Sequence, residues 1–400
     1  VFLEHVLTQS IDTFNPANNP HGLAYPSYPR RYSLDPEMRS TWDDYNLENY
    51  DFGIREALRS IPTMSLVLDH DDLWSLSTGI YPNAVNRGDD WRRAGSIEYF
   101  DAAGGEGFQG NVGVQIHGNS SRLSGRTRKH SFRLIFNPDF EGPGSLNFPL
   151  FQQSDVADIN TIILKGGNQD SFPTRTFTGR ASSLVATYMR DEWVRETHRA
   201  MGHLEVESKY VHLYVNGLYW GLYQAVERID DAMLASRLGG EREDWDVILP
   251  YGEYIGSNQA WNEMFTLARQ IPSSNPATAD AIYFRLQGRN SDGSANEHYP
   301  VYLDMDSLID YLIVHYYSNA QEWINIDLRA ARNRVDPGLG FQLFAWDVDV
   351  SLNGLYSSDI NRSVGGSSSG QELSWLLRRS PEFQLRFADR VQLHLFNGGA

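Results

Sequence analysis

The sequence of 400 residues contains no cysteine. Disulfide bonds and thiolate metal sites are therefore excluded, and side-chain packing must hold the fold together. The absence fits a bacterial extracytoplasmic protein slightly better than a cytosolic one. The chain also lacks an apolar run of about 18 residues, so we expect no segment that spans a membrane.

Basic residues are scarce relative to acidic ones. The chain has 34 Lys and Arg against 51 Asp and Glu, which gives a formal net charge of −17. Because such a surface repels polyanions, we expect neither nucleic acid nor an anionic membrane as a partner. A cation or a basic protein substrate suits this charge. The histidines show no HExxH spacing, which argues against a zinc hydrolase.

The first half of the chain has the alternation typical of β-strands. Aromatic runs within Tyr210–Glu227 flank Asn216-Gly217, which predicts a tight hairpin. A helix of about twenty residues is predicted to end near Met201-Gly202. Further strands are predicted at 63–69, 96–100, 112–117, 130–136 and 161–165.

The second half is mainly helical, apart from a hairpin of 328–334 and 341–349. A β-rich half followed by a helical half predicts an α+β fold with two lobes. We divide the chain into an extended arm (1–60) and a domain (61–400), whose β-rich lobe is 61–228 and whose helical lobe is 229–400. Helices are predicted at 229–239, 259–270, 279–287, 305–319, 371–379 and 382–397.

The segment Phe341–Asp349, FQLFAWDVD, is predicted to be an apolar strand that ends in two aspartates. In a strand, Asp347 and Asp349 would share a face, with their Cα atoms roughly 7 Å apart. Mg²⁺ favours one or two carboxylates together with water and phosphate oxygens. The pair is therefore a candidate metal-phosphate site. The alternative is a strand end whose aspartates cap the next turn.

A polar turn and a basic strand follow the predicted strand at 112–117. Backbone amides of a turn such as Gly118–Arg122 can hold phosphate oxygens, and the next strand can present a cation. The candidate contacts are Asn119, Ser120, Arg122 and Lys129. The alternative is a hairpin turn with a solvated basic patch.

Two carboxylates are candidates for supporting roles. A buried lysine near phosphate needs a carboxylate partner, and we choose Glu227 for Lys129. The alternative is a solvated Glu227 paired with Arg228. In the polar segment Ser318–Asp327, Glu322 can accept a proton from a nucleophile.

The same polar segment also offers a metal ligand. Asn325 or Asp327 can share a metal with Asp347. The alternative reading of Ser318–Asp327 is an ordinary helix end and turn.

Two acidic segments raise the question of Ca²⁺. The aspartates of Asp69–Asp72 can bind Ca²⁺, but they also suit the cap of a short helix starting near Leu73, which we favour. The loop at 290–293, NSDG, lacks the full EF-hand ligand series.

These segments, in this order, resemble the spore-coat CotH kinase family, a group of atypical relatives of protein kinases. The resemblance covers about residues 60–395 and is most specific in the hairpin and WDxD segments. The matching segments are 116–122 (IHGNSSR), 128–136 (RKHSFRLIF), 164–170 (LKGGNQD), 188–193 (YMRDEW), 214–230 (YVNGLYWGLYQAVERID) and 344–354 (FAWDVDVSLNG).

The resemblance implies a kinase-like bilobal fold, ATP and Mg²⁺ as cofactors, and phosphoryl transfer to Ser or Thr of a protein. Asp347 would take the role of the kinase DFG aspartate. Beside it, we keep Asp349 and Asp327 as candidate metal ligands from the residue patterns described above. Glu227 would anchor Lys129, the phosphate-contacting lysine. Arg190, in YMRD, would reach the nucleotide or hold its helix to the sheet.

The chain departs from the family pattern at two places. Glu322 stands where the catalytic loop has Asp, and His130 stands where a second lysine is expected. A carboxylate displaced by about 1 Å can lower the rate roughly 10²-fold. Two alternatives therefore stay open: an inactive adhesion or scaffold domain, and a kinase-like enzyme that transfers AMP or another group.

The resemblance also bears on location. Domains of this kind are embedded in large secreted bacterial proteins, so we expect an extracytoplasmic or cell-surface location. The chain starts at Val1 with no signal peptide visible. We therefore expect further domains of a longer chain among its partners, beside a protein substrate or binding partner.

Overall fold

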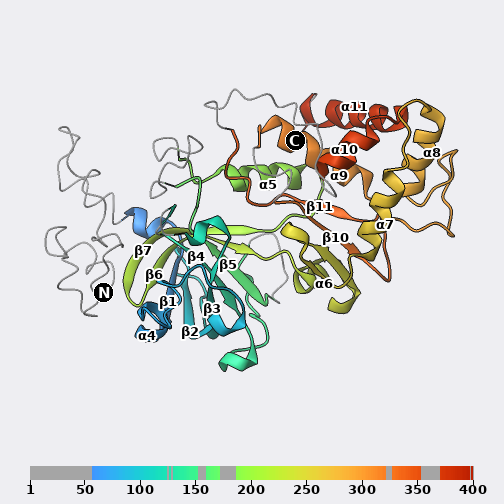
Figure 1. Cartoon of the computed structure of the whole chain (residues 1–400). Helices are drawn as coiled ribbons and strands as arrows, with labels where there is room; N and C mark the ends of the chain where they lie inside the picture. The colour runs from blue at the N-terminus through green and yellow to red at the C-terminus, as the bar shows by residue number, and fades with distance from the viewer. Residues whose placement is uncertain are drawn as a thin grey trace, which may run out of the picture. The chain divides into compact units, whose positions relative to one another are not determined.

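In the computed structural model, the described residues are 56–123, 126–127, 129–151, 159–171, 186–320, 327–352, 370–396 and 398–399. They belong to two compact units (Figure 1). The first holds the described residues up to Ala186 and Glu207–Arg228, and the second holds Thr187–Val206 and those from Ile229 onward. The predicted 1–60 arm lies almost entirely outside the described residues.

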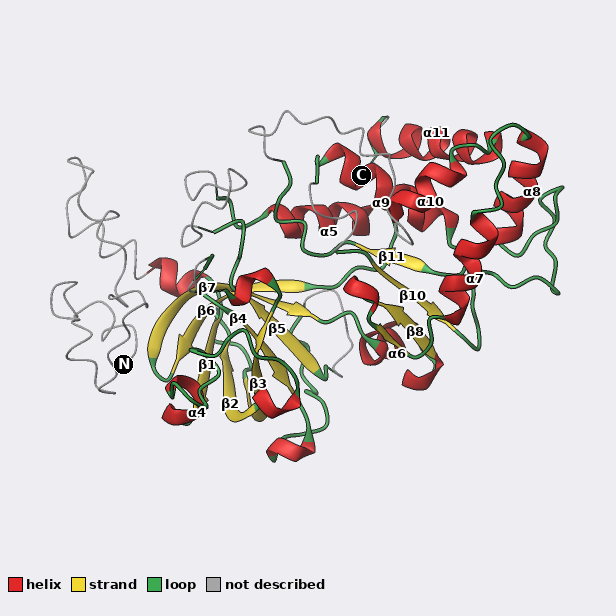
Figure 2. Ribbon diagram, in the orientation of Figure 1, coloured by secondary structure: helices red, strands yellow, loops and turns green. Residues whose placement is uncertain are grey.

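The first unit is a closed seven-stranded barrel with the strand order β1-β2-β3-β4-β5-β7-β6 (Figure 2). Neighbouring strands are antiparallel, except that β6 runs parallel to β1 and closes the barrel. The predicted strands are confirmed, but the sequence indicated only hairpins. The strands are β1 (Thr63–Leu68), β2 (Arg93–Phe100), β3 (Phe108–His117), β4 (Ser131–Ile135), β5 (Thr161–Lys165), β6 (Ser208–Val215) and β7 (Leu218–Glu227).

The predicted hairpin is the connection between β6 and β7. Asn216 and Gly217 have φ of 49° and 80°. Two consecutive left-handed residues match the twist of antiparallel strands, and Asn and Gly adopt this conformation with little strain. Val215 pairs with Leu218 on either side of the turn.

The acidic segment after β1 is a helix cap. Asp69 is the N-cap of the short helix α4 (His70–Trp74), and its side chain accepts hydrogen bonds from the amides of Asp71 and Asp72 at 2.8 and 3.4 Å. The capping interpretation is confirmed, although the helix begins at His70 and not at Leu73. The other two aspartates lie in the first turn, where negative charge is favourable.

The second unit contains a four-stranded sheet, with the order β11-β10-β8-β9, and most of the helices (Figure 2). The α+β class predicted from the sequence is confirmed. The strands are β8 (Trp245–Ile248), β9 (Tyr254–Ile255), β10 (Arg329–Asn333) and β11 (Gln342–Phe344). The sequence did not indicate β8 and β9, because such short strands show little alternation.

The helices of the second unit match the predicted positions, with ends that differ by a few residues. The helix α9 is its centre, because Leu308 and Leu312 are fully buried. In the part of the chain that the structure describes, no helix combines the length and hydropathy needed to cross a membrane. The helices are α6 (Asp231–Leu238), α7 (Gln259–Ala268), α8 (Pro276–Leu286), α9 (Met305–Tyr317), α10 (Gly370–Leu377) and α11 (Pro381–Leu395).

The helix α5 (Arg190–Ala200) belongs to the second unit, whereas the sequence placed it in the β-rich lobe. Its described part is shorter than the predicted twenty residues. The physical reason for its place is hydrophobic burial, since Val194 is fully buried in the same apolar cluster as Leu308 and Leu312 of α9.

Candidate functional site

The acidic segment after β11 does not continue as a strand. β11 ends at Phe344, so the predicted strand through Asp349 is wrong. The amides of Ala345 and Val348 donate to side-chain carboxylates instead of to a neighbouring strand. Asp347 has φ of 58°, in the left-handed region. The alternation argument that placed Asp347 and Asp349 on one face therefore does not apply.

Asp347 is the most accessible residue of an otherwise buried segment. Every other residue from Leu343 to Val350 is buried, and Asp347 is half-buried. Residues with a Cβ atom seldom adopt this conformation, Asp and Asn more readily than the others, and such residues cluster at functional sites. Asp347 is thus held in a defined backbone conformation and remains partly accessible to solvent.

Two buried carboxylates from the α5 region hold the backbone beside Asp347. Asp191 Oδ1 accepts from the Val348 amide at 2.9 Å, and Glu205 Oε1 accepts from the Ala345 amide at 2.7 Å. Sequence reasoning singled out Arg190 and missed both residues. The available signal was YMRD itself, where Asp191 follows Arg190.

Both carboxylates have partners of their own. Arg195, fully buried, donates to Asp191 Oδ2 at 3.3 Å and to the carbonyl of Val206 at 3.0 Å. His198 Nδ1 lies 2.6 Å from Glu205 Oε1. Burial raises the pKa of Glu205 to about 8 and lowers the pKa of His198 to about 3. Both groups are therefore mainly uncharged near pH 7.

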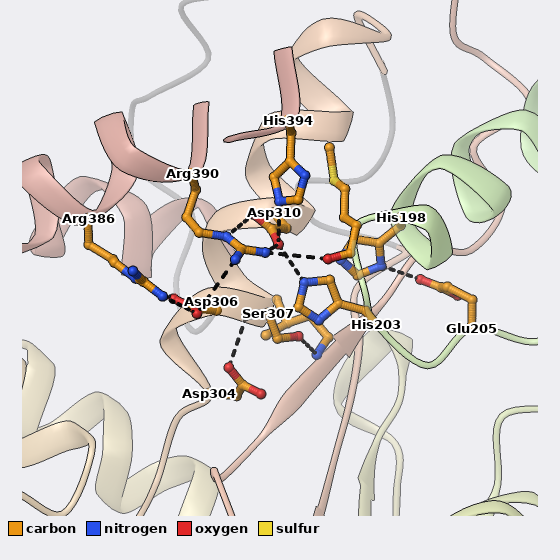
Figure 3. A network of polar contacts seen from close by, with 12 residues as sticks. His198, His203, Glu205, Asp304, Asp306, Ser307, Asp310, Arg386, Arg390 and His394 are labelled. Carbon is orange, nitrogen blue, oxygen red and sulfur yellow. Dashed lines mark hydrogen bonds and ion pairs between the residues drawn. The ribbon is translucent and has the colours of Figure 1, made fainter. Parts of the chain in front are cut away.

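The pair of His198 and Glu205 lies beside a larger polar network (Figure 3). The His198 ring stacks on His203, with centroids 4.5 Å apart. His203 donates to Asp310 Oδ2 at 2.6 Å, and Arg390 and His394 donate to the same carboxylate. Burial would raise the pKa of Asp310, but the bonds from His203 and Arg390 lower it to about 2.

The other predicted metal ligands are less accessible. Asp349 is 6% exposed and Asp327 is 8% exposed. Among the described residues, no three His, Asp or Glu side chains are grouped closely enough to hold a metal ion. Glu322 and Asn325 lie outside the described residues. In the 290–293 loop, the Asp292 carboxylate accepts from the Ser294 amide at 2.9 Å, as in an ordinary turn.

Lys129 lies in the first unit, against β7. Its Nζ donates to the Leu222 carbonyl and lies 4.5 Å from the centre of the Tyr223 ring. Gly221 has φ of 117°, and a Cβ there would come within 3.4 Å of the Lys129 side chain. Burial lowers the pKa of Lys129 to about 7. The ammonium group is thus poorly solvated.

The lowered pKa of Lys129 predicts a pH dependence of stability. Between about pH 7 and pH 10 the unfolded state binds the proton more strongly than the folded state, so the folded state gains stability as the pH rises. We expect the melting temperature of the wild type to rise relative to that of Lys129→Met over this range. Thermal unfolding followed by circular dichroism measures the difference. A difference that stays constant with pH would contradict the lowered pKa.

Arg122 forms hydrogen bonds with the backbone of its own unit, the barrel. Its guanidinium donates to the backbone carbonyls of Ala84, Asn86, Ile116 and Gly118. The side chain is 7% exposed, and burial, followed by repulsion from another arginine, lowers its pKa to about 10. Four of its five N–H donors are therefore used on backbone carbonyls, which gives Arg122 a role in holding the turn.

The neighbouring turn residues are more accessible. Asn119 is exposed and its side-chain oxygen accepts from Arg87 at 2.6 Å. Ser120 is half-buried and begins a short 3-10 helix, Ser120–Arg122. Asn119 is thus the more accessible of the two residues, and its oxygen already has a partner.

Glu227 ends β7 and is 5% exposed. Its Oε2 accepts from the Glu207 amide at 2.8 Å. The Lys129 ammonium contacts Leu222, which precedes Glu227 by five residues on β7. Five residues of a strand span about 16 Å between the Cα atoms of Leu222 and Glu227. The structure thus places the lysine near the middle of β7 and the carboxylate at its end.

The predicted residues divide between the two units. The first unit holds Lys129 and Glu227, together with the 118–122 turn, and the second holds Asp347 and Asp349. Asp327 and Arg190 are also in the second unit. Arg190 is the first residue of α5 and is 7% exposed.

The fold and site define an α+β protein with a β-barrel unit that holds a half-buried lysine and a helical unit that presents a constrained aspartate. Residues 114–397 match the sequence model of a family described as "CotH kinase protein". Because the match covers most of the chain, the protein belongs to the CotH kinase family. No curated protein matches the chain.

Proposed function

We propose that the protein binds Mg-ATP and transfers a phosphoryl group to Ser or Thr of a protein. The observation that carries the proposal is Asp347, a half-buried aspartate held with φ of 58° between two anchored amides. Membership of a kinase family supports the same conclusion. Mg²⁺ is usually bound by one or two carboxylates together with several waters and the phosphate oxygens of a substrate, so a single accessible aspartate suits it.

The residues of the chain fit the proposed cofactors in chemical type. Asp347 would hold the metal ion, and Asn119 and Ser120 would donate to phosphate oxygens. Lys129 would be protonated more fully near phosphate, since an adjacent negative charge raises the pKa of a lysine. The bound metal would neutralise charge on the transferred phosphoryl group. In this proposal Glu322 orients the acceptor hydroxyl.

The proposal extends to the setting of the protein. We place the domain outside the cytoplasm, as part of a longer secreted chain at a bacterial cell surface, with a protein as acceptor. The family resemblance and the lack of cysteine support this setting.

Nucleotide titration tests the proposal. We expect Mg²⁺-dependent binding of ATP by the wild type, and at least a roughly tenfold weaker binding by Asp347→Asn, since losing one charged metal contact costs about 1.4 kcal/mol or more. Isothermal titration with Mg²⁺ and with EDTA measures this. Asp246→Asn is a matched control, because Asp246 is a buried carboxylate of the same unit that accepts from the Ser257 amide.

Labelled ATP identifies the group transferred. Transfer of the γ-label to a Ser-rich basic protein supports phosphorylation, whereas transfer of the α-label supports movement of AMP. Equal ATP affinity of the wild type and Asp347→Asn would remove Asp347 from the site. Absence of both binding and transfer would favour an adhesion or scaffold domain.

A further inference from the structure

Asp191 and Glu205 have no part in the proposed contacts with metal and phosphate. They nevertheless accept hydrogen bonds from two backbone amides, one on each side of Asp347. Asp191 accepts from Val348 at 2.9 Å, and Glu205 accepts from Ala345 at 2.7 Å. Asp191 is 7% exposed and Glu205 is 1% exposed. Neither carboxylate is therefore solvated like a surface group.

We propose that Asp191 and Glu205 are positioning residues that hold Asp347 in its left-handed conformation and so fix the direction of its carboxylate. The inference rests on the proposed function, because the benefit of a fixed carboxylate is the binding of Mg²⁺. It adds two residues of the α5 region to the site.

The geometry explains why two acceptors are needed. One anchored amide leaves the chain free to rotate about the bonds of Asp347, whereas anchors at Ala345 and Val348 fix both sides. The left-handed conformation is less favourable than extended ones for a residue with a Cβ atom, although Asp and Asn adopt it more readily than other residues. Without the anchors, extended conformations of the segment would compete with the one observed.

The anchors are themselves immobilised by the fold. Asp191 is held by Arg195, whose guanidinium also donates to the Val206 carbonyl. Glu205 contacts His198, which stacks on His203 (Figure 3). The Asp347 segment is thus tied to the packed interior of the second unit by contacts that involve no ligand.

Conservative and disruptive variants separate positioning from bulk stability. Glu205→Gln keeps the oxygen acceptor of Glu205, and Asp191→Asn keeps one for the amide while its amide nitrogen replaces the oxygen that faces Arg195. Asp191→Ala and Glu205→Leu remove the acceptors. Burial raises the pKa of Glu205 to about 8, so Gln resembles the neutral form of this residue near pH 7. Asp246→Ala is the control, since it removes from the same unit a buried carboxylate that accepts from the Ser257 amide and pairs with Arg334.

Hydrogen exchange provides a readout that does not depend on ATP. In mass spectrometry, we expect the peptide that spans 345–348 to exchange at least tenfold faster in Asp191→Ala and Glu205→Leu than in the wild type. Asn and Gln variants should restore slow exchange. The Asp246→Ala control should leave this peptide unchanged and speed exchange around Ser257.

Titration of Mg²⁺ and ATP completes the test. We expect about a tenfold weaker Mg²⁺-dependent affinity in the two disruptive variants and near wild-type affinity in Asn, Gln and control variants. Unchanged exchange at 345–348 in the disruptive variants would overturn the positioning role. Faster exchange with wild-type Mg-ATP affinity would show that the anchors do not serve the site. Faster exchange in a protein whose wild type binds no Mg-ATP would overturn the proposed function and leave the anchoring itself intact.

Discussion

Replacing Asp310 by alanine is expected to lower the free energy of unfolding of the second unit by about 3–5 kcal/mol. The carboxylate is fully buried and accepts from Arg390, His203 and His394 (Figure 3). Its removal leaves the Arg390 guanidinium without its nearest carboxylate, and His203 and His394 without their shared acceptor. Urea unfolding followed by tryptophan fluorescence measures the loss.

The acid limb of stability provides a second readout for Asp310. The hydrogen bonds from His203 and Arg390 outweigh the effect of burial and lower its pKa to about 2, below the ordinary value of 3.8 for an aspartate. A lowered carboxylate pKa contributes stability above about pH 4, and this contribution is lost as the pH falls toward 2. We expect the wild type to lose stability over this range, and Asp310→Ala to lose less.

Asp306→Ala is the matched control for Asp310. Asp306 pairs with Arg386 and Arg390 but its side chain is 34% exposed. Isolated surface ion pairs contribute about 0–1 kcal/mol and a bidentate pair more, so removing this partly exposed carboxylate should cost less stability than removing the fully buried Asp310. Equal losses in Asp306→Ala and Asp310→Ala would contradict the central role of Asp310.

Replacing Arg122 by alanine is expected to destabilise the barrel unit by about 3 kcal/mol or more, because buried carbonyls lose charged donors. The side chain contacts the carbonyls of Ala84, Asn86, Ile116 and Gly118. Thermal unfolding measures the change. The result also separates this structural role from the phosphate contact that the sequence suggested.

Arg87→Ala is the control for Arg122, because Arg87 is exposed and lies near the same turn, where it donates to Asn119. Surface substitutions usually change stability by less than about 0.5 kcal/mol. If Arg122→Ala kept wild-type stability and lost only ATP affinity, the phosphate assignment would stand and the structural role would fail.

Local sequence patterns predicted most elements of the fold. The Asn216-Gly217 turn, the Asp69 cap and the strand Thr161–Lys165 all occur as expected. Each depends on neighbouring residues alone: two left-handed positions, a side-chain acceptor near free amides, and an apolar β-branched run. Family motifs along the chain also identified the CotH kinase family, to which the chain belongs.

Local patterns failed where the backbone depends on distant partners. β11 was extended too far in the prediction, because FAWDVD has strand-like alternation. The structure ends β11 at Phe344, since the next amides bond carboxylates that are 140 and 157 residues away in the chain. The alternation of apolar and polar residues indicates only which side chains suit burial, and it does not reveal such distant hydrogen-bond partners.

Local patterns in the sequence were enough to predict the α+β class, the turns and caps, and the acidic character of the segment with Asp347. Contacts between distant segments were visible only in the three-dimensional structure. They show that β6 closes the barrel against β1 and that Arg122 faces backbone carbonyls. They also show that Asp191 and Glu205 anchor the Asp347 segment. The physical reason is that hydrogen bonds between distant segments depend on how the elements pack. No local periodicity encodes that packing.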